Sequence, residues 1–326
     1  MSEDAAGRTA LENAWSRFAT YDHGANEAQK RFIRLRLWML AVGVAATTLA
    51  IFYTEYVEDS SVRPAFSDWR FYVWLPMMAM PILGSVLAAG ASKLARGVDW
   101  LSLRGAAESI KREIFRYRCR VGPFAADGAA SGSPDEKLAA AVARITGRLM
   151  DSGVLHGKLK PYAGPLPPFA PEGDDGFSAL IPEQYLKWRV GDQLSYFRTK
   201  ASGLERRHRI FRWSVAGLGG LGTLLAALGQ EIWVPVSVGV AAAFTAYLEL
   251  RNVEVNLAAY NRAALELDNV VTWWTGLAED AKSEAANFAA LVDRTETVLG
   301  SENASWVHEM QDAMAKYEER RKGDKE

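Results

Sequence analysis

The sequence predicts an all-α integral membrane protein with four transmembrane helices, arranged as two helical hairpins and extended by long cytoplasmic, coiled-coil-like helices. Three observations support this fold class. Four stretches of the 326-residue chain contain no Asp, Glu, Lys or Arg, although these residues make up 24% of the whole. Basic residues gather on one side of these stretches, and apolar residues recur at spacings of three and four in the segments beside them.

A bilayer crossing needs roughly 20 helical residues, with about 17 near the lower limit. The charge-free stretches are Leu37–Tyr53, Phe71–Ala91, Trp213–Leu228 and Ile232–Leu248. Only Gly229, Gln230 and Glu231 separate the last two, so these predict a tight hairpin. The first two stretches reach the length of a crossing, and the last two are shorter than the second, so the tip of their hairpin barely reaches the far headgroups. The alternative is a buried hairpin in a soluble bundle, and the basic flanks argue against it.

The distribution of Lys and Arg predicts that both termini are cytoplasmic, because cytoplasmic loops carry an excess of these residues. Fifteen basic residues lie near the ends of the spans on the side that carries the termini. They are Lys30, Arg31, Arg34, Arg36, Lys93, Arg96, Arg104, Arg198, Lys200, Arg206, Arg207, Arg209, Arg212, Arg251 and Arg262. The loop between the first two spans offers only Arg63 and Arg70, and the other loop offers none.

The chain repeats one plan, a polar helix, a membrane hairpin and another polar helix, at an offset of 176 residues. This predicts a first unit over 1–121 (spans about 37–53 and 71–91), a spacer over 122–182, and a second unit over 183–326 (spans about 213–228 and 232–248, then a long C-terminal helix). The spacer is rich in Gly, Ala and Pro, with one short helix near Asp135–Met150. Its proline density favours extended chain.

The segments beside the spans carry apolar residues at alternating spacings of four and three. After the fourth span this repeat continues from Val253 to Leu299 and predicts a single helix of about 46 residues. Similar apolar repeats, or seams, lie before the third span, from Val190 to Phe211, and after the second span, from Trp100 to Tyr117. Such helices need partners to cover their apolar stripes. His208 lies on one seam, where it fixes register or acts as a pH switch.

Small residues in the spans are candidates for close helix packing or for the lining of a narrow lumen, and the sequence leaves both readings open. They are Gly43, Thr47, Thr48, Gly84, Ser85, Gly217, Gly220 and Thr223. The basic cluster of Arg206, Arg207, Arg209 and Arg212 is a candidate contact for lipid headgroups, or for an anionic nucleotide.

The residues indicate a protein that is not an enzyme, without catalytic, cofactor-binding or metal-ligating sites. Cys119 is the single cysteine, the four histidines are scattered, and no GxxxxGK[ST] loop is present. A net charge of -1 argues against nucleic acid as a partner. An ion-coupled transporter is disfavoured because the four spans lack the charged group that ion coupling needs.

Several segments resemble the SLATT family of two-transmembrane domains. The clearest is Tyr185–Ala201 (YLKWRVGDQLSYFRTKA), together with the tail from Thr297 to Met310, notably Glu302 and Trp306. Ala14–Phe18 with Tyr21 and Asp22, and Trp100 to Glu108, are similar to a sister subtype. The resemblance implies a membrane effector of prokaryotic conflict or anti-phage systems, encoded beside a nucleotide-signal synthase or sensor. No catalytic residues are attributed to the family.

We therefore expect a multi-pass protein of the prokaryotic cytoplasmic (inner) membrane, whose partners are the lipid bilayer, further copies of itself and a nucleotide-signal sensor or synthase encoded nearby. The first hypothesis for its function is an oligomeric effector that forms a pore or perturbs the membrane. The alternative is a membrane-anchored helical scaffold that recruits a cytoplasmic partner and has no pore activity.

Overall fold

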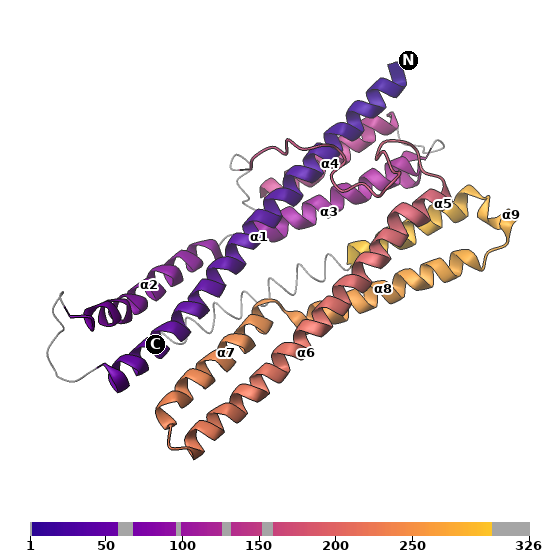
Figure 1. The fold of residues 1–326 in the computed structure, drawn as a ribbon. Coiled ribbons are helices and arrows are strands. Elements are labelled where there is room, and N and C mark those ends of the chain that lie inside the picture. Colours follow the sequence, from indigo (N-terminus) through magenta and orange to yellow (C-terminus); the bar gives the residue numbers. More distant parts are fainter. Residues whose placement is uncertain (1, 58–67, 96–98, 126–131, 152–158, 302–326) are drawn as a thin grey trace. The chain divides into compact units, whose positions relative to one another are not determined.

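The computed structural model describes residues 2–57, 68–95, 99–125, 132–151 and 159–301, and every regular element within these ranges is a helix (Figure 1). The predicted all-α class is therefore confirmed. The chain divides into two compact units. The hairpin unit comprises Lys30–Arg96 and Gly203–Val255, and the core unit comprises Met1–Gln29, Gly97–Ser202 and Asn256–Glu326. This division runs across the predicted units 1–121 and 183–326, because each gives its apolar hairpin to one unit and its amphipathic helices to the other.

The hairpin unit holds two helical hairpins. The first joins α1 (Ser2–Tyr56) to α2 (Phe71–Ala95), and the second joins α6 (Asp192–Ala227) to α7 (Val234–Leu250) through a turn and the short 3-10 helix η4 (Glu231–Trp233). The turn contains Gly229 with a φ of 68°, a conformation that glycine adopts without strain.

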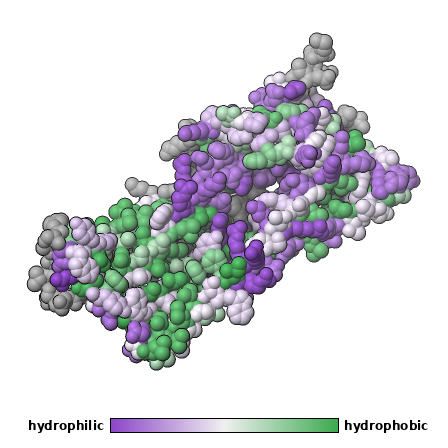
Figure 2. Space-filling model, viewed as in Figure 1, coloured by the Kyte–Doolittle hydropathy of each residue, from purple (hydrophilic) through white to green (hydrophobic). Residues whose placement is uncertain are grey.

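Four helices are long and apolar enough to cross a membrane, as the charge-free stretches predict. Between 0% and 6% of the residues in their most apolar windows are buried within the chain. Figure 2 shows the resulting hydrophobic surface gathered over α2 and α7. In water this much exposed apolar surface is unfavourable, so its natural surroundings are lipid or other membrane helices.

The core unit packs the first part of α1 against α3 (Asp99–Arg118), α4 (Pro134–Asp151), α8 (Val253–Thr275) and a helix over residues 285–301. Shorter elements complete it: η1 (Gly122–Phe124), α5 (Pro182–Tyr185), the π-helical turn η3 (Leu186–Gly191) and α9 (Glu279–Lys282). Its centre contains fully buried side chains from both halves of the sequence, namely Ile110, Ile114, Leu138, Leu267 and Leu291.

Residues 122–182 differ from the extended spacer that their prolines predict. The predicted short helix is α4, which buries Leu138, Ala141, Ile145 and Leu149. The proline-rich part also packs on the core unit, where Leu180 is 4% exposed and its backbone N–H donates to the carbonyl of Arg118 at 2.9 Å. Prolines remove amide donors, but the amides of Leu180 and Tyr162 donate to Arg118 and to Thr20 of α1, which attaches the segment to the core unit.

The single helix predicted from Val253 to Leu299 is wrong. Helix α8 ends at Thr275, the chain turns through α9, and the helix over residues 285–301 lies beside α8, in yellow in Figure 1. The guanidinium of Arg294 sits 4.1 Å from the ring centroid of Trp273, which places the two helices together. Gly276 follows the end of α8, and the backbone of Ala278 is extended, so the chain turns here. The apolar spacing continues on both sides of this turn and therefore gives no sign of it.

Candidate functional site

The small residues of the first hairpin fall into two groups. Gly84 faces the partner helix, because a Cβ built on it lies 3.8 Å from Val42, whereas a Cβ on Gly43 meets nothing within 4 Å. The hydroxyls of Thr47, Thr48 and Ser85 donate to carbonyls of their own helices, at 3.2, 2.9 and 3.0 Å. Their hydrogen-bonding needs are therefore met without a lumen or a partner.

The second hairpin is closed at Gly222. A Cβ built there would lie 2.8 Å from Oγ of Ser237, which is itself 4% exposed on α7. The candidate glycines Gly217 and Gly220 meet nothing within 4 Å, and Thr223 is exposed and donates to the carbonyl of Gly219 at 3.2 Å. Gly222 therefore packs the hairpin together, while Gly217 and Gly220 leave an open face on α6.

We expect Gly222→Leu to destabilise the second hairpin by about 1–3 kcal/mol, because the added side chain meets Ser237 at a distance that real Cβ atoms do not tolerate. Gly219→Leu on the same helix is the control, since a Cβ there meets open space and leucine is a better helix former than glycine. Far-UV circular dichroism during SDS titration measures the difference. Equal stability of the two variants would contradict this packing.

The basic cluster lies on α6, at the beginning of its apolar stretch. Arg206, Arg207, Arg209 and Arg212 are all exposed. Arg212 also lines a groove of about 580 Å³ together with His208, Val215 and Leu248. Its lining combines apolar side chains with Arg212 and with the carboxylates of Glu249 and Glu254, so an anionic headgroup would meet acidic as well as basic groups there.

His208 has a definite partner in this groove. Its Nε2 lies 3.0 Å from Oε1 of Glu254, which follows the start of α8. This contact ties α6 to the beginning of α8, in keeping with the register role predicted for His208. The pH-switch reading stays a hypothesis.

The most polar feature of the core unit is a buried ion pair between Arg189 and Glu296. Nε and Nη2 of Arg189 donate to the two carboxylate oxygens of Glu296, both at 2.8 Å, and the hydroxyl of Tyr185 donates to Oε1 at 3.0 Å. Arg189 is 2% exposed and the other two side chains are fully buried. Burial and the Glu296 carboxylate raise the pKa of Tyr185 well above its ordinary value, so its phenol stays protonated.

The π-helical turn η3 explains how Arg189 reaches this position. A π-turn contains an extra residue, which shifts the side chains relative to a regular α-helix. Arg189 and the adjacent Val190 are both buried within this turn. The guanidinium of Arg189 also stacks 4.4 Å from the ring centroid of Phe115 on α3, so this one side chain joins the two halves of the sequence.

A second buried ion pair holds the proline-rich segment. Nη1 and Nη2 of Arg118 donate to the carboxylate of Asp174 at 2.9 and 2.5 Å, and its Nε donates to the carbonyl of Ser178 at 3.0 Å. Nearby, Nε1 of Trp15 donates to the carbonyl of Gly176 at 2.8 Å. These contacts attach the segment to α1 and α3.

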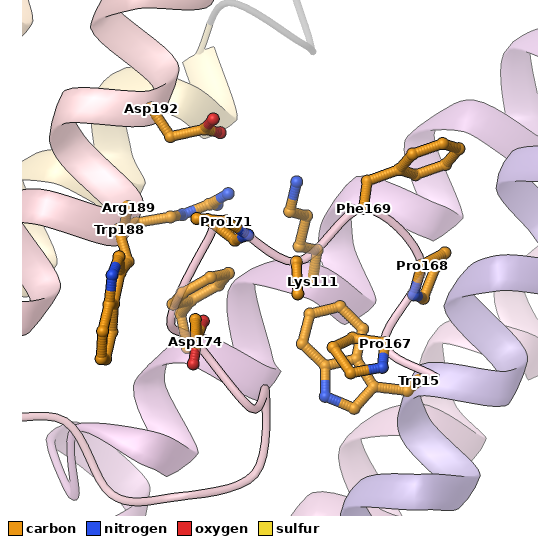
Figure 3. Close-up of a pocket in the computed structure, with 12 residues that line it drawn as sticks. Trp15, Lys111, Pro167, Pro168, Phe169, Pro171, Asp174, Trp188, Arg189 and Asp192 are labelled. Carbon is orange, nitrogen blue, oxygen red and sulfur yellow. The ribbon is translucent and has the colours of Figure 1, made fainter. Parts of the chain in front are cut away.

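A small cavity lies between these two ion pairs. It measures about 20 Å³, and Figure 3 shows the twelve residues that line it. The side chains of Lys111 and Arg189 point toward each other across it. Its apolar walls are formed by Trp15, Trp188, Pro167, Pro168 and Pro171.

The sequence reading missed Arg189, Glu296, Arg118, Asp174 and Lys111. Arg189 stands inside the YLKWRVG run quoted for the family resemblance, and Glu296 lies next to Thr295 on the predicted seam, so both signals were present but unspecific. Within the described residues no group of three or more His, Cys, Asp or Glu side chains is placed to hold a metal ion. Burial raises the pKa of the Cys119 thiol, which makes it a poor nucleophile.

Comparison with known families gives two matches. Residues 185–306 match the family described as SMODS and SLOG-associating 2TM effector domain 1 (SLATT_1). Residues 16–131 match a family described as a protein of unknown function (DUF4231). No curated protein and no solved structure gives a significant match.

Proposed function

We propose that this chain, whose residues 185–306 match the SLATT family, is an oligomeric membrane effector whose hairpins assemble with those of other copies into a pore. The predicted surroundings are the prokaryotic cytoplasmic membrane, with both termini in the cytoplasm. A nucleotide-signal sensor or synthase encoded nearby supplies the trigger. The chain itself carries out no catalysis in this proposal.

The observation that supports assembly is the open glycine face of α6. Gly217 and Gly220 are three residues apart on one side of a charge-free membrane helix, and a Cβ built on either meets nothing within 4 Å among the described residues. Glycine faces allow two membrane helices to approach closely, because no side chain separates their backbones. A face of this kind without an occupant in its own chain fits a second copy, and a ring of such contacts encloses a pore.

We expect the purified full-length protein to carry ion current across a planar lipid bilayer, and Gly220→Leu to lower that current at least about tenfold. The added side chain keeps neighbouring α6 helices apart, and about 1.4 kcal/mol of lost association is already a tenfold effect. Cross-linking in the same membranes reports the oligomer that accompanies the current.

Gly203→Leu is the matched control. It lies on the same helix, it also meets nothing within 4 Å, and it precedes the charge-free stretch. Its current should equal that of the unaltered chain. A folded, inserted protein that carries no current overturns the pore and favours the scaffold, whose coiled helices recruit a partner without permeating the membrane.

A further inference from the structure

The cavity of the core unit combines cationic and aromatic groups that the proposed pore does not use. It is bounded by α1, α3, the π-turn η3 and the proline-rich segment, all within one unit (Figure 3). A volume of about 20 Å³ admits roughly one water-sized group. One oxygen of a larger molecule therefore fits inside while the rest of that molecule remains at the rim.

Two cationic groups meet at this cavity. Nη1 of Arg189 is buried and has no hydrogen-bond partner within the described part of the chain, because Glu296 occupies only Nε and Nη2. Nζ of Lys111 lies 5.6 Å from the ring centroid of Phe18, and the nearby carboxylates of Glu108, Asp192 and Asp22 favour its charged form. Burial, with the nearby guanidinium of Arg189, lowers the pKa of Lys111. Both groups gain from an incoming anion.

An aromatic ring stands at the rim. Phe169 is 88% exposed although it is a large hydrophobic residue, and its φ of 63° is a conformation that residues with bulky side chains avoid. Trp188 lines the same cavity, and its buried Nε1 has no partner among the described residues. Strained backbone and exposed aromatic surface together are features of ligand-binding loops.

We propose that this cavity binds a small organic phosphate that carries a planar ring, with the phosphate against Lys111 and Nη1 of Arg189 and the ring against Phe169. Glu296 already balances the charge of Arg189, so Lys111 supplies the charge and Nη1 of Arg189 supplies unpaired N–H donors, which the three acceptor oxygens of a phosphate can occupy together. The proposal does not depend on the pore, because every contact lies in the core unit.

Two acidic side chains also line the cavity, and they oppose an anion to different degrees. Asp174 is neutralised by its bidentate pair with Arg118. Asp192 is exposed at the rim, where its carboxylate accepts a hydrogen bond from Gln193 at 3.1 Å. Asp192 repels a phosphate, so its removal should strengthen binding, whereas removal of Lys111 should weaken it.

Isothermal titration calorimetry of the detergent-solubilised full chain tests the site with phenyl phosphate and with inorganic phosphate as probes. We expect phenyl phosphate to bind saturably, Lys111→Gln to weaken it at least about tenfold, and Asp192→Asn to tighten it several-fold. Phe169→Ala should weaken phenyl phosphate and leave inorganic phosphate unchanged, because only the former has a ring.

Lys160→Gln is the matched control, since Lys160 is an exposed lysine in the proline-rich segment outside the cavity. Its binding should equal that of the unaltered chain. Absence of saturable heat from a protein with intact helical circular dichroism overturns the proposal and leaves a single buried water as the occupant. Equal weakening by Lys111→Gln and Lys160→Gln overturns it as well, because it shows attraction by general charge alone.

Discussion

Replacing Glu296 by Gln is expected to lower the free energy of unfolding by about 3–5 kcal/mol, because it leaves Arg189 charged, buried and without a counter-ion. The change keeps the size of the side chain, so loss of packing contributes little. Chemical denaturation of the full chain in detergent, followed by tryptophan fluorescence, measures the effect. Tyr185 gives a second probe, since its hydroxyl donates to the same carboxylate at 3.0 Å.

The control for this prediction is Asp293→Asn on the same helix. Asp293 also pairs with an arginine, Arg116, at 2.7 Å, but its side chain is about half exposed. Exposed ion pairs contribute roughly 0–1 kcal/mol, so this variant should remain close to the unaltered chain. A similar loss of unfolding free energy in both variants would show that the burial of the Arg189–Glu296 pair does not determine the effect.

A double variant, Arg189→Met with Glu296→Leu, tests whether the loss of stability comes from the unpaired charge. When both members of a buried pair become apolar, stability is often recovered, because no charge remains to be desolvated. We expect the double variant to be more stable than Glu296→Gln alone. Tyr185 then loses its acceptor, so recovery should be incomplete until Tyr185→Phe is added.

The membrane part of the fold is the part that sequence predicts best. The absence of charge over Leu37–Tyr53 and Phe71–Ala91 leaves few alternatives, since a charged residue at the bilayer centre is costly. Of the apolar repeat predicted before the third span, Val190, Phe197 and Ala201 are buried, whereas Leu194 and Leu204 are only partly buried. In each case one physical rule, exclusion of charge or helical spacing, decides the outcome.

The buried ion pairs and the chain reversal of the core unit were not predicted, because they depend on irregular backbone. Arg189 and Val190 lie in a π-helical turn, and the extra residue of such a turn shifts side chains away from the positions that regular helical spacing predicts. The apolar repeat from Val253 continues past Gly276 because the returning helix has apolar residues at the same spacing, among them Phe288 and Val292. Periodicity records which face is apolar, but it does not record where a chain reverses.

The second large loss of stability is expected at Trp15, which holds the proline-rich segment on the core unit. Trp15→Ala is expected to cost about 3–5 kcal/mol, because the indole is 4% exposed and packs edge-on against Phe18 and Phe115, with ring centroids 5.6 and 6.4 Å away. The variant also leaves the carbonyl of Gly176 without its donor. Trp15→Phe retains most of the apolar contact and should cost about 1–3 kcal/mol, the typical penalty of one unpaired buried group.

Hydrogen exchange shows whether Trp15 acts through the segment. The amide of Leu180 donates to the carbonyl of Arg118 at 2.9 Å and should be protected in the unaltered chain. We expect Trp15→Ala to reduce this protection before α4 loses its own, since α4 keeps its buried apolar face. Phe169→Ala in the same segment should change neither stability nor protection, because that ring is 88% exposed. If Leu180 and α4 lose protection together, the segment unfolds with the whole core, and Trp15 has no separate role in attaching it.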